Sequence, residues 1–215
     1  MKNIKFAIFA LLLFSFVVCL PAAASAQTIS GDWKANDWDW SWNNKNKDKN
    51  KDKDDDWDKN DNDKDKVQLN FRYSRNGGTS NHGSSYDYSE LQGLTKEQVN
   101  GSNSSVKFRL VREAGTIECE GTFNNGKGSG TFRFTANPTF VSGMQSRGFD
   151  LSKDERLFSA TTLNLTLAFV DEIRSAGFKN LDTEDLFKAK IFKVDSAFMK
   201  EMAAATRLTA VAEPL

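Results

Sequence analysis

Three tryptophans, Trp38, Trp40 and Trp42, occupy every second position of the stretch "WDWSW". In an extended chain their side chains project on one side, and such a row of indoles can stack on sugar rings or peptides. Compositional drift in a low-complexity segment is the alternative explanation of the same pattern. We therefore treat these tryptophans as candidate binding residues, with a glycan or a peptide as the expected ligand.

The stretch "DKNDNDKDK" raises the question of calcium. Asp58, Asn60 and Asn62 stand at alternate positions, as the ligands of an EF-hand loop do. Asp63, however, stands where that loop needs Gly for its turn, and Leu69 stands where it needs a bidentate Glu. We expect no specific calcium site, and weak calcium binding by the acidic residues stays an open alternative.

His82 is the only histidine, and the Gly, Ser and Asn content around it predicts a mobile loop from Ser74 to Tyr86. A catalytic side chain has to be held to within about 0.5 Å of its productive position, which such a loop does not achieve. The sequence also has no HExxH motif and no Cys and His cluster that would form a transition-metal site. We expect no enzyme activity, no metal and no cofactor.

The segment "GTFNNGKGSG" comes close to the phosphate-binding pattern G-x-x-x-x-G-K-[ST]. Gly121, Gly126 and Lys127 fit its positions, but Gly128 replaces the required Ser or Thr. A phosphate-binding loop also leads into a helix, and here the sequence continues as a strand pattern. We therefore exclude nucleotide binding.

The first residues predict export. Lys2 and Lys5 precede a run, 6–20, that is apolar except for Ser15, and the small residues 24–26 follow it, which is the pattern of a signal peptide cleaved after Ala26. The run of 15 residues is shorter than the roughly 20 that a helix needs to cross a bilayer. We expect a protein of the periplasm or cell surface that does not span the membrane after cleavage.

Without the signal peptide, 27 basic residues face 29 acidic ones, which argues against nucleic acid as a partner. Cys119 is then the only cysteine, so no internal disulfide can form. From position 43 to 66 the chain consists of nine Asp, eight Lys, six Asn and one Trp, and these residues cannot fill a core. The composition predicts a disordered leader over residues 27–66.

An antiparallel β-region is expected over residues 67–136. Apolar and polar residues alternate strictly in four segments, namely 67–73, 106–110, 117–123 and 132–134. The Asn-Gly pair in "NNGKGSG" predicts a tight hairpin between the last two. Cys119 falls on the apolar side, so we expect a small core residue and not a reactive thiol.

The last third, residues 137–215, contains a repeat. Phe140, Phe169 and Phe198 are 29 residues apart, and the flanking residues keep the same register. Asn137, Thr166 and Asp195 can each cap a helix start, and further starts are expected near Ser152 and Asp182. Gly148 and Gly177 are expected to end two of these helices. We therefore predict an α+β fold, in which a small antiparallel sheet of about four strands is followed by stacked helix-turn-helix repeats of 29 residues.

Residues 86–203 resemble an uncharacterised bacterial module that also occurs in the extracytoplasmic part of antirepressor metallopeptidases of the beta-lactam-sensor type. The resemblance is carried by "YSELQGLTKEQ", by "REAGTIECEGTFNNGKGSGTF" and by "FVDEIRSAGFKNLDTEDLFKAKI". It implies the architecture and a link to sensing at the cell envelope. The zinc motif and membrane helices of those peptidases are absent from this sequence, so the resemblance transfers no catalytic residue.

Together these patterns predict an exported, non-catalytic module that binds a protein or peptide of the cell envelope. The candidate contacts are charged residues of the expected helices: Asp171, Glu172, Arg174, Lys188 and Lys190. The alternative is a structural protein, or one that binds glycan or cell wall through Trp38, Trp40 and Trp42.

Overall fold

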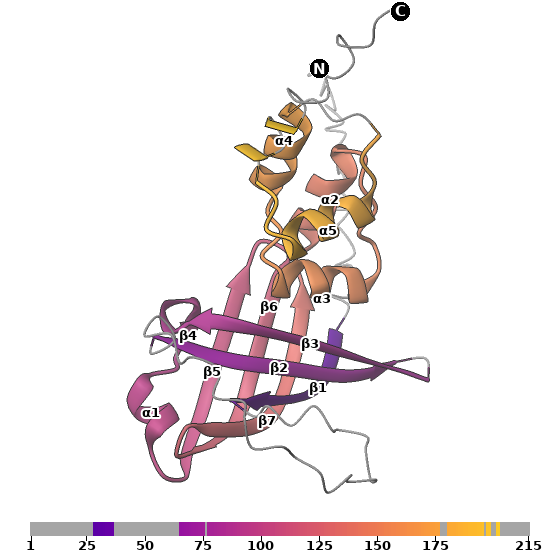
Figure 1. Ribbon diagram of the computed structural model, residues 1–215. Helices are drawn as coiled ribbons and strands as arrows, with labels where there is room; N and C mark the ends of the chain where they lie inside the picture. The colour runs from indigo at the N-terminus through magenta and orange to yellow at the C-terminus, as the bar shows by residue number, and fades with distance from the viewer. Residues whose placement is uncertain are drawn as a thin grey trace, which may run out of the picture.

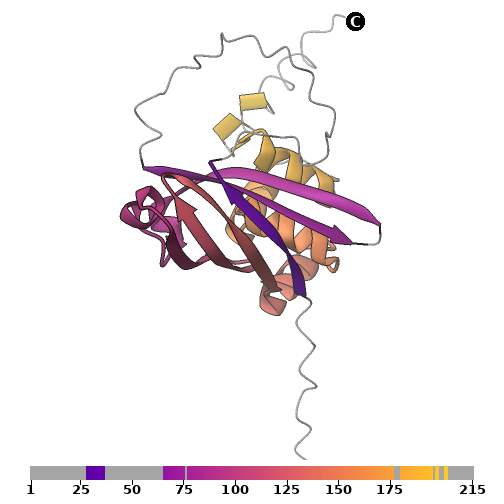
Figure 2. The same cartoon turned by 90° about the horizontal axis from the view of Figure 1, so that it is seen from below.

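The computed structural model describes residues 28–36, 65–75, 77–176, 180–195, 197–198 and 201–202. Its strands are β1 (Thr28–Ala35), β2 (Lys66–Arg75), β3 (Gly78–Asp87), β4 (Leu91–Gln92), β5 (Ser104–Arg112), β6 (Gly115–Asn124) and β7 (Lys127–Ala136). They form one antiparallel sheet in the order β3-β2-β1-β7-β6-β5-β4, which curls into a half-barrel (Figure 1, Figure 2).

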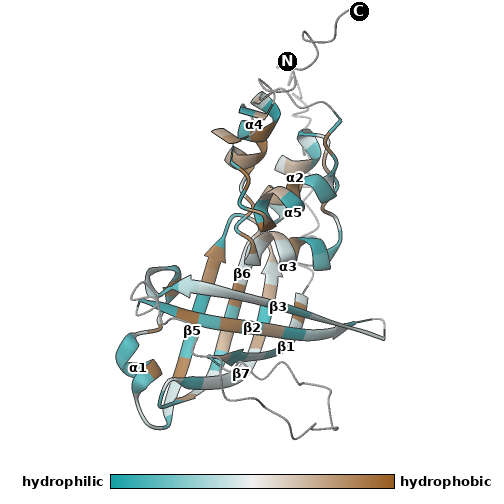
Figure 3. Ribbon diagram, viewed as in Figure 1, coloured by the Kyte–Doolittle hydropathy of each residue, from teal (hydrophilic) through white to brown (hydrophobic). Residues whose placement is uncertain are grey.

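Period-two patterning gives this sheet one apolar face. In β2, Val67, Leu69 and Phe71 are fully buried, while the residues between them are partly exposed, and the same alternation is visible along β5 in Figure 3. The four strands expected from alternation are all present, as β2, β5, β6 and β7. The predicted hairpin joins β6 to β7 through Asn125 and Gly126, whose φ angles are 50° and 86°.

The curl brings side chains of distant strands together. The Trp33 ring of β1 lies 5.3 Å from the Phe108 ring of β5, although β7 and β6 separate those two strands in the sheet. In the same way Phe71 of β2 contacts Phe132 of β7 across β1, with a ring separation of 5.2 Å. The apolar face is therefore the inside of the half-barrel, and its core is mainly aromatic.

The helices lie at the two ends of the curled sheet (Figure 1). One end carries α1 (Lys96–Asn100), and the other carries α2 (Pro138–Ser146), α3 (Asp154–Thr162), α4 (Leu167–Ser175) and α5 (Thr183–Ile191). A short 3-10 helix, Tyr88–Glu90, links β3 to β4. Helix α3 contacts β1, β3, β6 and β7, and its Phe158 ring packs on those of Phe71, Phe132 and Phe134, so it closes one end of the core.

Several expected helix boundaries are confirmed. Asn137, Thr166 and Asp182 cap α2, α4 and α5 through their side chains, and Gly148 follows α2 with a φ of 84°. The start near Ser152 differs, because Lys153 is the N-cap of α3 and makes no side-chain cap. Gly177 lies outside the described residues.

The predicted fold class is wrong. The sheet has seven strands instead of about four, and the helices are a few short elements on it, not a stack of repeats. In a stacked array the equivalent phenylalanines would share one kind of core position. Phe140 is 2% exposed, whereas Phe169 is half-buried and Phe198 is 50% exposed.

Two of the missed strands lie in segments that were expected to be irregular. Residues 28–35 belong to the expected leader but form β1, where Trp33 is fully buried between β2 and β7. Residues 78–86 were expected to lie in a mobile loop but belong to β3, which pairs with β2 along its whole length. Residues 27 and 37–64 of the expected leader lie outside the described residues.

Candidate functional site

The outer side of β3 is a free sheet edge within the described part of the chain. β2 and β3 form a hairpin in which Arg75 pairs with Gly78, and no described strand pairs with the other side of β3. In an antiparallel ladder, the N–H and C=O of every second residue point away from the partner strand. Counted from the closing pair, the residues whose backbone groups point away from β2 are Thr79, Asn81, Gly83 and Ser85. These backbone groups can pair with a further extended chain.

The alternate residues Ser80, His82, Ser84 and Tyr86 have less exposed side chains, on the inner face of the curl. His82 stacks on Tyr73, with ring centroids 5.9 Å apart, and packs edge-on against Phe158 at 5.0 Å. Burial lowers the pKa of His82 below its ordinary value of 6.5. His82 is thus held by aromatic packing, and its rigid support contradicts the expected mobile loop.

Two adjoining hollows run along β3 and form what we call the edge groove. The first, of about 420 Å³, lies between β3 at Asn81 to Ser84 and the side chains of α3 and α5 that include Phe187 and Ile191. Arg156 of α3 and Glu184 of α5 also line it, and Arg156 Nη2 forms an ion pair of 2.6 Å with Glu184 Oε1. Ile191 is 57% exposed, so the groove offers an apolar wall next to a strand edge.

The second hollow, of about 730 Å³, shares Gly83, Ser84, Thr162, Leu163 and Ile191 with the first. It continues toward the other end of β3, where Tyr86, Glu90 and Arg112 line it. Arg112 Nη2 donates to Glu90 Oε1 at 2.5 Å. The two hollows therefore form one continuous depression along the free edge.

Tyr86 and Arg112 have unused hydrogen-bonding capacity. The Tyr86 hydroxyl and Arg112 Nε are both buried and have no hydrogen-bond partner among the described residues. Ser84 lies beside Tyr86 but does not complete a hydrogen bond of ordinary geometry. Burial raises the pKa of Tyr86 well above its usual range, so its hydroxyl stays protonated and can donate.

Lys190 lines the same hollow from α5. Its Nζ lies 4.7 Å from the centroid of the Phe169 ring on α4, a cation–π contact. Burial, followed by the nearby positive charge of Arg112, lowers the pKa of Lys190. Lys190 is thus one of the sequence-predicted contact residues that the structure places in the edge groove.

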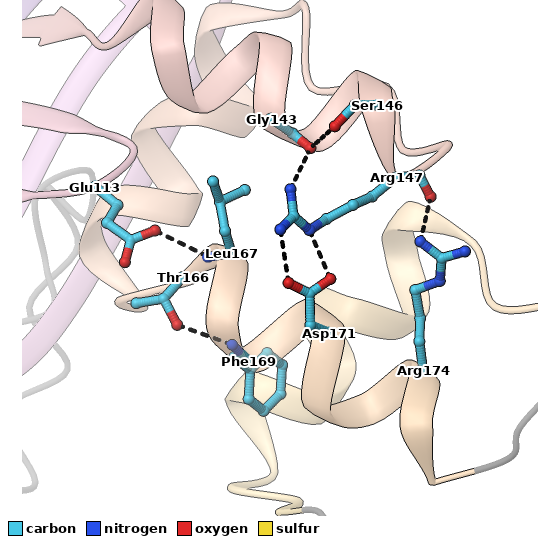
Figure 4. Close-up of polar contacts among 9 residues, drawn as sticks. All are labelled: Glu113, Gly143, Ser146, Arg147, Thr166, Leu167, Phe169, Asp171 and Arg174. Carbon is cyan, nitrogen blue, oxygen red and sulfur yellow. Dashed lines mark hydrogen bonds and ion pairs between the residues drawn. The ribbon is translucent and has the colours of Figure 1, made fainter.

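Two predicted contact residues of α4, Asp171 and Arg174, do not line the groove and instead bind Arg147 at the end of α2 (Figure 4). Asp171 accepts from Arg147 Nε at 2.7 Å and from Arg147 Nη2 at 2.6 Å, which joins α4 to the end of α2. Arg174 Nη1 donates to the carbonyl oxygen of Arg147 at 3.2 Å. These two side chains hold the helix layer together.

The other predicted residues are not gathered at one place. Glu172 is an exposed residue of α4, and Lys188 of α5 forms an exposed ion pair of 3.3 Å with Asp185. Trp38, Trp40 and Trp42 lie outside the described residues, as do Asp58, Asn60 and Asn62, the positions considered for calcium. The described part of the chain contains no group of three or more His, Cys, Asp or Glu arranged to hold a metal ion.

Cys119 is confirmed as a core residue. Its side chain is 1% exposed, and burial raises the pKa of its thiol far above the usual range. The sequence interpretation missed Tyr86 and Arg112. Each stands at the end of a strand, and no motif around them distinguishes them from ordinary strand residues.

Comparison with models of known protein families, with curated proteins and with solved structures gave no match. The resemblance to the envelope module is therefore left without support, and we assign no family. None of the helices in the described ranges has the length and apolar character that crossing a membrane requires.

Proposed function

We propose that this chain is an exported, non-catalytic binding protein of a bacterial cell envelope, and that it takes an extended peptide segment of a partner as an additional strand on β3. The edge groove is the observation that carries the proposal. A strand edge that no described strand pairs with runs beside hollows of about 420 and 730 Å³. An added strand pairs with such an edge through main-chain hydrogen bonds, and neighbouring pockets then select its side chains.

The composition of β3 supports this use of the edge. Natural sheets protect exposed edges with Lys, Pro or bulges. From Gly78 to Tyr86 the strand contains neither Pro nor a charged residue, and Gly83, Ser84 and Ser85 leave room for a second backbone. The exposed Ile191 side chain on the opposite wall is a contact for an apolar side chain of the bound segment.

Export is supported by the sequence of the first residues. The expected cleavage after Ala26 leaves Gln27 as the first residue, and β1 begins at Thr28. To test export, the full chain is expressed in a bacterial host, the cells are fractionated, and the N-terminus of the accumulated protein is determined by mass spectrometry. A product that starts at Gln27 in the periplasmic or extracellular fraction is expected; an uncleaved cytoplasmic product contradicts the export proposal.

Peptide binding is tested with a displayed library of random peptides selected against the purified chain that begins at Gln27. Selected peptides are then measured against two variants at a single position, Ser85→Pro and Ser85→Ala. Ser85→Pro removes an outward N–H of the free edge, whereas Ser85→Ala keeps it. We expect the proline variant to bind at least tenfold more weakly and the alanine variant to bind like the parent chain.

Two results would overturn this assignment. If the selected peptides bind Ser85→Pro as well as they bind the parent chain, they do not use the edge of β3. If the selection enriches no peptide above a surface without protein, the chain does not bind peptides in this way. A dimer in sedimentation that dissociates in Ser85→Pro assigns the edge to a second copy of the chain, which also contradicts a peptide partner. Circular dichroism and thermal unfolding of both variants check that the fold is kept.

A further inference from the structure

We propose that Tyr86, Arg112 and Lys190 form a carboxylate-binding site in the second hollow of the edge groove. The carrier of that carboxylate is the peptide bound on β3, and this part of the inference rests on the proposed function. The site itself stands on the three side chains and is testable without any peptide.

Two unpartnered donors carry the argument. Tyr86 is 2% exposed, and its hydroxyl and Arg112 Nε are buried without a hydrogen-bond partner among the described residues. A buried polar group without a partner is costly, and folded proteins avoid such groups unless a ligand or an ordered water completes them. Tyr86 and Arg112 both line the same hollow, and in the proposed site one carboxylate accepts from both donors.

The charges around the hollow favour an anion. Arg112 and Lys190 are near enough for the charge of the first to act on the second. Three cations, Arg112, Lys190 and Lys193, line the hollow together with two carboxylates, Glu90 and Asp195, so the lining keeps a positive surplus. Glu90 pairs with Arg112 Nη2, and Asp195 Oδ1 accepts from the N–H of Phe198 at 2.8 Å. A bound anion relieves the repulsion between Arg112 and Lys190.

A carboxylate fits these groups in number and kind. It is an acceptor with two oxygens and about four lone-pair positions, which matches a guanidinium N–H, a phenol O–H and an ammonium group. Ser84 and Ser85 of β3 line the same hollow. A segment paired with β3 therefore passes the site, and either an acidic side chain or the terminal carboxylate of that segment can reach it.

The test begins with sodium acetate. Isotope-labelled chain is titrated with acetate at constant ionic strength, and the Nε–H resonance of Arg112 is followed by NMR. We expect a saturable shift that weakens at least fivefold in Tyr86→Phe, which removes one oxygen but keeps the ring packed against Phe71. Lys190→Gln should weaken it similarly, and Lys107→Gln, at an exposed lysine of β5 outside the hollow, should not.

The outcomes separate this inference from the proposed function. No saturation in the parent chain, or equal affinity in Tyr86→Phe and Lys190→Gln, overturns the site. Selected peptides are also compared with versions whose Asp and Glu are changed to Asn and Gln, and with versions amidated at the C-terminus. Peptides that bind equally well after the acidic side chains are neutralised and after the C-terminus is amidated overturn the carboxylate assignment but leave strand addition on β3 intact. If acetate binds but no peptide is selected, the carboxylate site is supported, and the proposal that a peptide carries the carboxylate is overturned.

Discussion

The indole of Trp33 lies directly against the backbone of Gly121. A Cβ atom built on Gly121 would stand 2.7 Å from Trp33 Cζ2 and still closer to the carbonyl oxygen of Ser129. Gly121 pairs across the β6–β7 ladder with Gly130, which in turn pairs with Trp33 on β1. Two adjacent strands, β6 and β7, therefore place glycines beside the ring that β1 contributes, and the absence of their side chains leaves room for this close approach.

Gly121→Ala should lower the free energy of unfolding by about 2 kcal/mol, because the added methyl meets backbone atoms that cannot move aside. Urea unfolding followed by tryptophan fluorescence and circular dichroism measures the change. Gly78→Ala is the matched control, since the nearest atom to a Cβ at that position is 3.6 Å away. Equal stability of Gly121→Ala and Gly78→Ala would contradict a steric role for Gly121.

Arg75 connects the β2–β3 hairpin to α3. Its Nη1 donates to Asp154 Oδ2 at 2.6 Å, and the Asp154 side chain is 2% exposed while that of Arg75 is 42% exposed. Arg75→Ala leaves a buried carboxylate without its cation, so we expect a loss of about 2 kcal/mol in unfolding free energy, less than for a fully buried pair. Lys107→Ala, which breaks an exposed pair with Glu120, should cost at most about 0.5 kcal/mol.

Denaturant unfolding of both variants gives the comparison. If the two variants lose the same stability, the Arg75–Asp154 pair is no more than a surface contact. A double-mutant cycle with Asp154→Ala isolates the energy of the pair itself. In the Asp154→Ala background no buried carboxylate remains, so Arg75→Ala no longer leaves an unpaired charge.

Glu113 fixes the start of α4 to the turn between β5 and β6. Its Oε2 accepts from the N–H of Leu167 at 2.9 Å, next to the Thr166 hydroxyl that caps Phe169 N–H (Figure 4). Glu113→Ala should cost about 1 kcal/mol, as removal of a helix cap does. Glu113→Gln keeps an acceptor oxygen and should retain most of that stability; hydrogen exchange of the α4 amides shows whether the loss is local to this helix.

Alternation made part of the fold predictable. Each of β2, β5, β6 and β7 has apolar residues at every second position, so burial of one face determined both the strand and its orientation. The Asn125–Gly126 turn was predictable for a separate reason, since it needs positive φ at both positions. These elements are specified by residues close together in the sequence.

The missed strands depend on partners that are distant in the sequence. β3 contains "GTSNHGSSYD", which favours turns by composition, and it is a strand because β2 satisfies its backbone. The segment that forms β1 did contain a strand signal, because Ile29, Trp33 and Ala35 all fall on one side. The segment was nevertheless assigned to the disordered leader, because the polar residues that follow it dominate the composition. Tyr86 and Arg112 line one hollow from the ends of β3 and β5, and no local pattern encodes that arrangement.

Acid should destabilise the fold through His82. Because burial lowers the pKa of His82 in the folded chain, the unfolded chain, with a pKa near 6.5, binds the proton more readily. Stability from this residue is therefore complete above pH 6.5 and is lost as the pH falls from 6.5 through the folded-state pKa. Thermal unfolding measured in steps from pH 7.5 to pH 5 should show a decline across that interval.

His82→Phe is the control for this titration, since it keeps a ring against Tyr73 and Phe158 but carries no ionisable group. His82 is the only histidine of the chain, so the part of the decline that disappears in His82→Phe belongs to this residue alone. A decline of the same size in both proteins would assign the acid sensitivity to carboxyl groups. It would also mean that the imidazole is more accessible to water than its packing between Tyr73 and Phe158 indicates.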